Sequence, residues 1–184
     1  QFGKAAGFYL DATEVPFDKY YNMYSYLVDE LPKLIGKEFN ADMSRQSITG
    51  HSMGGHGALT IALKNPDRFK SCSAFAPICR PSEASWSKPS FEKYLGPDQS
   101  NWRQYDACDL IADGRRFSPI LVDQGDVDEW MEEGCRPQEL VEAVQGTDID
   151  LTMRIQEGHD HYYPFVSTFM HEHIAWHARH LTAT

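Results

Sequence analysis

The chain has 184 residues, of which 41% are hydrophobic and 12% aromatic, which is ample for a packed core. This composition excludes a disordered chain, a collagen-like chain and a coiled coil. A formal net charge of −10 argues against a nucleic-acid-binding protein, because phosphate contacts require a basic face. No stretch approaches 18 consecutive apolar residues, so we expect no membrane-spanning helix.

The first part of the chain predicts a helix, a strand and a second helix. Apolar residues recur at helical spacing over residues 20–35, where Pro32 predicts an irregularity or an end. Residues 45–49 form a short segment that we interpret as a buried strand. The apolar run at residues 58–63 predicts a helix that ends before Asn65-Pro66-Asp67.

The rest of the chain continues the alternation of strands and helices. Residues 77–97 are rich in Ser, Pro and charge, and a stretch this long is usually functional or contains short helices. We expect strands at 70–76, 118–123 and 148–156, and helices at 137–144 and 163–180. Such alternation predicts an α/β fold with a mostly parallel sheet flanked by helices. Since no repeat or linker is visible, residues 1–184 are predicted to form a single domain.

The four cysteines indicate a reducing compartment. Cys72, Cys79, Cys108 and Cys135 are irregularly spaced and form no C-x-x-C pair. A chain of this size needs no disulfides to fold, and a zinc site would need paired close ligands. We therefore expect free thiols, no metal and a cytoplasmic protein.

The segment Gly50-His51-Ser52-Met53-Gly54 matches the G-x-S-x-G nucleophile elbow of serine hydrolases. It lies between an expected strand and an expected helix, which is the context that the elbow requires. Side chains at Gly50 and Gly54 would clash with the adjoining strand and helix. The turn should present the Ser52 hydroxyl at the C-terminal edge of the sheet. It should also direct the Met53 N–H towards a developing oxyanion.

A serine nucleophile needs a base and a carboxylate, and in this fold the chain order is serine, acid, histidine. The strand ending at residue 123 leads into a turn crowded with Asp123, Asp126, Asp128 and Glu129. Asp128, three residues beyond Gly125, fits best as the acid. Asp126 is the alternative.

The base is expected in the loop before the last helix. This loop reads Gly158-His159-Asp160-His161, and we assign the base to His161 with His159 as the alternative. His51 and His56 flank the elbow and are too close in sequence to serve.

Four more histidines lie on the last expected helix: His171, His173, His177 and His180. His173 and His177 are four residues apart and could bind a metal ion as a pair. No carboxylate completes an H-E-x-x-H motif, so we interpret these histidines as part of a solvated helical face.

Several segments resemble the S-formylglutathione hydrolase (esterase D) family. They are GFYLDAT, MYSYLVDELPKLI, GHSMGGHGALTIALKNPDRFKSCSAFAPIC, KYLG, ILVDQGDVDEW and VSTFMHEHIAWHARHL. The resemblance extends over essentially the whole chain. The G-x-S-x-G elbow is common to many hydrolases, whereas GHSMGGHGAL followed by NPDRF is far more specific to this family. The resemblance implies an α/β-hydrolase fold.

The resemblance assigns the same three catalytic residues as the chain order does. The family's serine, acid and base align with Ser52, Asp128 and His161. It implies hydrolysis of the thioester S-formylglutathione to glutathione and formate, a step of formaldehyde detoxification, without a cofactor. Trp86 matches a family tryptophan near the site, where it either lines the acyl pocket or only packs. The family usually has Ser-Tyr-Tyr after the base, whereas this chain has Tyr162-Tyr163-Pro164.

The resemblance also implies that family members carry about ninety further residues before this segment, as whole single-domain enzymes of this class run well over 200 residues. We therefore expect the first strands and the second oxyanion donor upstream of this chain. Family members are often homodimers. Three alternatives remain: a general carboxylesterase, a feruloyl-type esterase or acyltransferase, and a non-catalytic binding module of the same fold.

Overall fold

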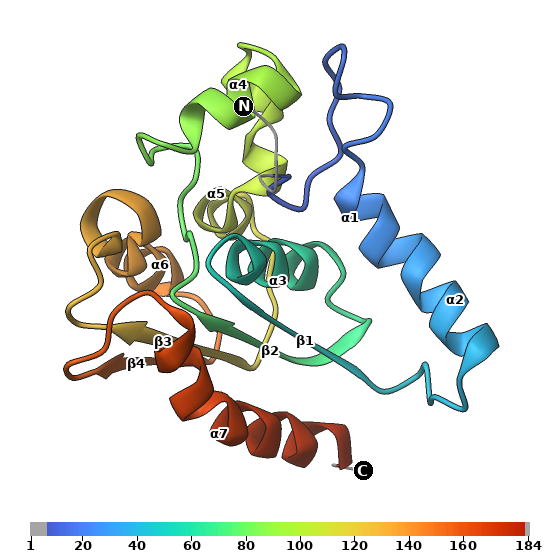
Figure 1. Ribbon diagram of the computed structural model, residues 1–184, viewed down its shortest axis with the longest axis vertical. Helices are drawn as coiled ribbons and strands as arrows, with labels where there is room; N and C mark the ends of the chain where they lie inside the picture. Colours follow the sequence, from blue (N-terminus) through green and yellow to red (C-terminus); the bar gives the residue numbers. More distant parts are fainter. Residues whose placement is uncertain (1–6, 183–184) are drawn as a thin grey trace.

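A computed structural model describes residues 7–182 (Figure 1). Its four strands form one sheet in the order β1-β2-β3-β4, and every neighbouring pair is parallel. The strands are β1 (Gln46–His51), β2 (Phe69–Phe75), β3 (Ile120–Gly125) and β4 (Leu151–Gln156). The predicted parallel α/β sheet is therefore confirmed, with each strand within three residues of its expected start.

Helices cover both faces of the sheet, because each parallel strand needs a crossover back to its starting edge. The helices are α1 (Met23–Ser25), α2 (Leu31–Glu38), α3 (Met53–Lys64), α4 (Lys88–Leu95), α5 (Ala107–Ala112), α6 (Pro137–Val144) and α7 (Tyr163–Thr182). In Figure 1, α3, α5 and α6 lie on one face of the sheet and α7 lies on the other. The largest apolar core fills the space between α3, α5, α6 and the sheet.

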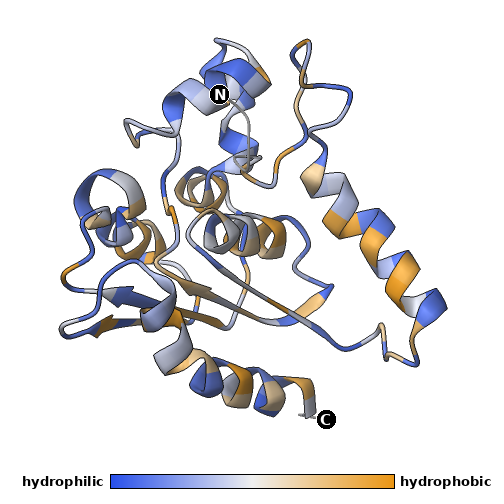
Figure 2. Cartoon of the chain, in the orientation of Figure 1, coloured by the Kyte–Doolittle hydropathy of each residue, from blue (hydrophilic) through white to orange (hydrophobic). Residues whose placement is uncertain are grey.

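The helix predicted at residues 20–35 is present with shifted bounds. Helical backbone runs from Met23 to Glu38, and a π-helical turn at Tyr26–Glu30 joins α1 to α2. Pro32 does not end the helix. Its missing N–H leaves the Val28 carbonyl without its usual helical donor, and the Arg68 guanidinium donates to that carbonyl instead. Figure 2 shows orange and blue alternating along α2, as expected of an amphipathic helix.

The long stretch at residues 77–97 contains α4, as anticipated for a segment of this length. Two short 3-10 turns follow at Gln99–Asn101 and Arg103–Tyr105. Aromatic side chains pack here against the start of the described chain: the Phe8 ring lies 5.6 Å from Phe91 and 5.6 Å from Trp86. This packing holds the segment against the start of the described chain. None of the helices within residues 7–182 is long and apolar enough to cross a membrane.

The interpretation of the histidines on α7 as a solvated face is wrong for two of the four. His173 and His177 are 0% and 8% exposed, and they face the sheet. His173 Nδ1 and His177 Nε2 both lie 2.8 Å from Ser73 Oγ, and His177 Nδ1 lies 2.7 Å from Ser71 Oγ. The helical period of α7 turns them inward, where serine hydroxyls contact three of their four ring nitrogens and His173 Nε2 faces Asp123 Oδ2 at 3.3 Å. The sequence around a single histidine does not show whether its side chain faces the sheet or the solvent.

Buried histidines should make stability fall in mild acid. Burial lowers the pKa of His56 and of His177 to about 4 from an ordinary value of 6.5. Between these values the unfolded chain binds more protons than the folded one, so stability is lost as pH falls from 6.5 towards 4. Each histidine should cost about 1.4 kcal/mol per pH unit in this window. Urea unfolding between pH 7 and pH 5 measures the slope.

The His177→Gln variant should show a shallower slope than the wild type. The matched control His171→Gln changes an exposed side chain on the same helix and should keep the wild-type slope. Equal slopes in all three proteins would contradict the assignment of a lowered pKa to His177 in the folded protein.

Candidate active site

The residues expected at the site come from three loops that follow β1, β3 and β4. Because these strands are parallel, their carboxyl ends meet at one edge of the sheet. Ser52 follows β1, Asp128 lies in the turn after β3, and His161 lies in the loop between β4 and α7. The structure thereby brings together side chains that are more than 100 residues apart in sequence.

Ser52 sits on a sharp turn between β1 and α3. Its backbone has φ 55° and ψ −116°, a conformation that L-residues rarely adopt. The Ser52 N–H donates to Phe75 O at 2.9 Å, which ties the turn to the end of β2. This is the strained strand–turn–helix geometry of a nucleophile elbow.

Only one of the two elbow glycines behaves as expected. A Cβ at Gly50 would lie 2.1 Å from the Gly54 carbonyl oxygen, so a side chain is excluded there. A Cβ at Gly54 would find its nearest neighbour, the Tyr9 hydroxyl, at 3.7 Å, which is ordinary contact. The expected clash at Gly54 is therefore wrong. The tight second position is Gly55, whose Cβ would lie 2.9 Å from the Pro77 side chain.

We expect Gly50→Ala to destabilise the protein by about 3 kcal/mol or more, because the backbone of the elbow cannot yield without moving Ser52. Gly54→Ala is the matched control and should change stability by less than about 1 kcal/mol. Thermal unfolding of both variants measures the difference. Similar thermal unfolding midpoints for Gly50→Ala and Gly54→Ala would contradict the close contact seen at Gly50.

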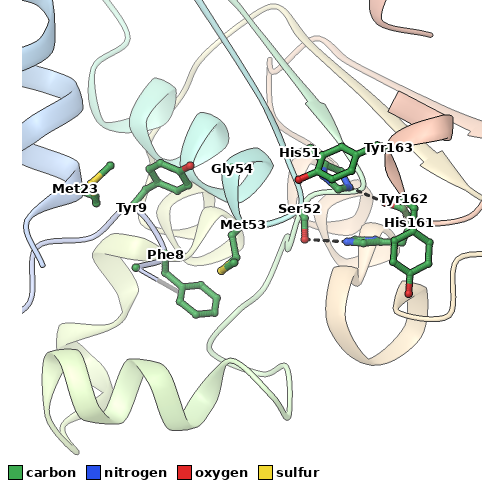
Figure 3. Close-up of a pocket in the computed structure, with 11 residues that line it drawn as sticks. Phe8, Tyr9, Met23, His51, Ser52, Met53, Gly54, His161, Tyr162 and Tyr163 are labelled. Carbon is green, nitrogen blue, oxygen red and sulfur yellow. Dashed lines mark hydrogen bonds between the residues drawn. The ribbon is translucent and has the colours of Figure 1, made fainter. Parts of the chain in front are cut away.

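The three expected side chains form one hydrogen-bonded chain (Figure 3 shows its serine–histidine link). His161 Nε2 lies 2.9 Å from Ser52 Oγ, and His161 Nδ1 lies 2.7 Å from Asp128 Oδ2. The alternatives lie elsewhere. Asp126 accepts the Gly158 N–H at 2.7 Å, and His159 Nδ1 lies 2.9 Å from the Glu157 carbonyl. These contacts brace the loop that carries His161 rather than reach Ser52.

Asp128 is a buried carboxylate held by several donors. Burial alone would raise its pKa, but the hydrogen bond from His161 and those from its other donors outweigh burial and lower the pKa. The Trp130 N–H donates to Oδ1 at 2.7 Å and Gln124 Nε2 donates to Oδ2 at 2.7 Å. Asp128 therefore remains ionised and orients the imidazole of His161.

Sequence reasoning missed two residues that position these side chains. Gln124 is buried in β3 and holds Asp128. His51 is too close to Ser52 to act as the base, but His51 Nε2 donates to the His161 carbonyl at 2.7 Å, and burial lowers the pKa of His51. The available signal was the position of Gln124, directly after the strand expected at residues 118–123 and one residue before Gly125. For His51 no sequence signal existed, since its partner is a backbone oxygen 110 residues away.

Met53 and Trp86 also lie beside Ser52. Met53 is the first residue of α3, so its N–H is among those that a helix leaves without an internal acceptor. A pocket of about 610 Å³ opens on this side of Ser52, between Phe8 and Met53 on one wall and His161 on the other (Figure 3). Trp86 lines a second pocket of about 250 Å³ whose walls include Ser52 and His161.

Comparison with known proteins assigns the family. Residues 1–180 match the family model described as putative esterase. The chain belongs to this esterase family. The S-formylglutathione hydrolases of Mus musculus and Bos taurus are 50% and 48% identical to it over 185 residues, which cover 99% of this chain. The chain spans about 65% of the length of these curated relatives.

Two solved structures are similar to this chain. An S-formylglutathione hydrolase from Agrobacterium tumefaciens is 63% identical, with a TM-score of 0.96 over 97% of this chain and 65% of its own. A fluorophosphonate-binding serine hydrolase of Staphylococcus aureus is 18% identical and superimposes with a TM-score of 0.75 over 94% of this chain and 68% of its own, which shows a shared fold. The expected α/β-hydrolase fold is confirmed.

Proposed function

We propose that the protein is a serine hydrolase that cleaves S-formylglutathione to glutathione and formate. The observation that carries this proposal is the hydrogen-bonded chain from Ser52 through His161 to Asp128. Relatives with this name, 48–63% identical, support the choice of substrate. We assign the roles of nucleophile, base and acid to these three residues, and propose that residues 1–184 belong to one α/β-hydrolase domain.

The first half of the reaction acylates Ser52. His161 Nε2 accepts the proton of Ser52 Oγ as this oxygen attacks the thioester carbonyl carbon. Asp128 accepts a hydrogen bond from His161 Nδ1–H throughout the step. Its negative charge stabilises the imidazolium that His161 becomes. The tetrahedral intermediate then expels the glutathione sulfur, which takes the proton from His161 Nε2. A formyl ester of Ser52 remains.

The second half releases formate. His161 Nε2 takes a proton from water, and the resulting hydroxide attacks the formyl ester. Collapse of the second intermediate returns the proton to Ser52 Oγ. We assign one donor of the oxyanion hole to the Met53 N–H at the N-terminus of α3, where the helix dipole favours negative charge.

We propose that the pocket of about 250 Å³ holds the acyl group. Trp86 and Trp130 form part of its wall with their ring centroids 6.4 Å apart, and Gly134 and Cys135 also line it. A Cβ on Gly134 would lie 2.9 Å from Trp86 Nε1, so the two indoles fill the space available. Such a wall favours small acyl groups.

Trp86→Ala should therefore broaden the acyl preference. We expect the ratio of kcat/KM for butyryl to formyl thioesters to rise about tenfold, since removing an indole opens room for several methylene groups. Phe39→Ala, which removes an exposed aromatic ring directly after α2, serves as the control and should leave the ratio unchanged. An unchanged ratio in the Trp86 variant would assign that side chain to packing alone.

The decisive test of the substrate compares S-formylglutathione with a feruloyl ester. A strong preference for S-formylglutathione, by at least about 100-fold in kcat/KM, is expected because the acyl pocket is small. Preference for the feruloyl ester would replace the proposal with a feruloyl-type esterase. If the full-length protein hydrolyses neither compound, a non-catalytic binding module of the same fold would be favoured.

We also propose a cytoplasmic location and a homodimer. Four free, buried cysteines support a reducing compartment. The dimer rests on the family resemblance, and light scattering during size-exclusion chromatography measures it directly.

A further inference from the structure

A fourth side chain lies against the Asp128–His161 pair. Cys135 ends the π-helical turn Met131–Cys135, and its Sγ lies 3.8 Å from both Asp128 Oδ2 and His161 Nδ1. Thiolate, imidazole and carboxylate are the three side-chain ligand types that zinc prefers. In residues 7–182, these three atoms are the one group of three or more such ligands that lie within 4.8 Å of one another.

The spacing of the three atoms is close to that of a tetrahedral site. Zinc bonds of about 2.1 Å to nitrogen and oxygen and about 2.3 Å to sulfur place N and O about 3.4 Å apart, and S about 3.6 Å from each. The observed separations are 2.7 Å for Nδ1 to Oδ2 and 3.8 Å from Sγ to each. A bound ion would widen the histidine–aspartate pair by about 0.7 Å and draw the sulfur inward by about 0.2 Å.

The surroundings allow these small shifts and offer a way in. The Trp130 N–H holds Asp128 through Oδ1 and Gln124 Nε2 donates to Oδ2, so an ion would take the place of the His161 hydrogen bond on Oδ2. Cys135 and His161 both line the proposed acyl pocket, so an ion can arrive by the route that the substrate uses. The same pocket gives room for a water molecule as fourth ligand.

We propose that Asp128, Cys135 and His161 form an inhibitory binding site for Zn²⁺ or another thiophilic divalent cation. Binding requires the lone pair of His161 Nδ1, so the imidazole proton moves to Nε2. Cys135 binds as the thiolate and releases its proton to solvent. One proton is therefore released for each ion bound, and no electron is transferred.

The shift of the histidine proton explains the inhibition. An imidazole that carries its proton on Nε2 donates to Ser52 Oγ and cannot accept the hydroxyl proton. The ion also replaces the hydrogen bond through which Asp128 stabilises the imidazolium. This part of the inference rests on the proposed serine hydrolase function, whereas binding of the ion does not.

The binding test uses Zn²⁺ for stoichiometry and Co²⁺ as a spectroscopic substitute. We expect one Zn²⁺ per chain by equilibrium dialysis, and a sulfur-to-cobalt charge-transfer band with Co²⁺. Cys135→Ala should abolish the band and weaken Zn²⁺ binding at least about tenfold, while Cys72→Ala, which removes another buried thiol, should preserve both. Absence of the band in the wild type, or equal Zn²⁺ affinity in Cys135→Ala, would overturn the site.

The activity test separates this inference from the proposed function. Each variant's hydrolysis of S-formylglutathione is measured relative to its own metal-free rate. Micromolar Zn²⁺ should inhibit the wild type and Cys72→Ala, EDTA should restore both, and Mg²⁺ should have no effect. Equal inhibition of Cys135→Ala would overturn the inhibitory site but leave the hydrolase intact. Binding without any metal-free turnover in the wild type would sink the hydrolase function and retain the metal site.

Discussion

Replacement of Ser52 with alanine is expected to lower kcat for S-formylglutathione by about 10⁴- to 10⁶-fold. The alanine has no oxygen to form the acyl ester, so any residual rate must come from water attacking a bound substrate. The fold should survive, because the strained turn is held by backbone contacts such as that from the Ser52 N–H to Phe75 O. Steady-state kinetics with a circular dichroism spectrum of the same sample measures both effects.

Ser167→Ala is the matched control, because it removes a hydroxyl from an exposed position of α7. Its kcat should stay within about twofold of the wild type. A Ser52→Ala protein that keeps more than a tenth of the wild-type rate would rule out Ser52 as the nucleophile.

Asp128→Asn should lower kcat by about 10⁴-fold while leaving the protein folded. The amide has nearly the shape of the carboxylate, but it carries no charge to stabilise the imidazolium of His161. Its NH₂ group can also face Nδ1 and hold the histidine in the wrong tautomer. The same steady-state assay measures the loss.

Asp126→Asn distinguishes the two acids that the sequence left open. Asp126 accepts the Gly158 N–H, and an asparagine oxygen can still accept it. We therefore expect this variant to keep its activity within about threefold of the wild type. A larger loss in Asp126→Asn than in Asp128→Asn would reverse the assignment.

The parts of this fold that follow from local pattern could be predicted from the sequence. Strand–helix alternation predicts a parallel sheet, and a parallel sheet brings the carboxyl ends of its strands to one edge. Chain order then placed Ser52, Asp128 and His161 in three loops at that edge. Their hydrogen bonds agree with that placement.

Features that depend on tertiary contacts could not be predicted in this way. The inward direction of His173 and His177 depends on serines of β2 that lie about 100 residues away. Likewise, the helix continues past Pro32 because Arg68, 36 residues later in sequence, satisfies the carbonyl that the proline leaves free. In both cases the sequence around one partner does not indicate which distant residue it will contact.

Whether Ser52 is an activated nucleophile can be measured by labelling the native protein with a fluorophosphonate, followed by mass spectrometry of its peptides. We expect one covalent phosphonyl adduct per chain, located on Ser52, and markedly slower labelling in the Asp128→Asn protein. Absence of an adduct on the folded protein, or an adduct on a residue other than Ser52, would contradict this expectation.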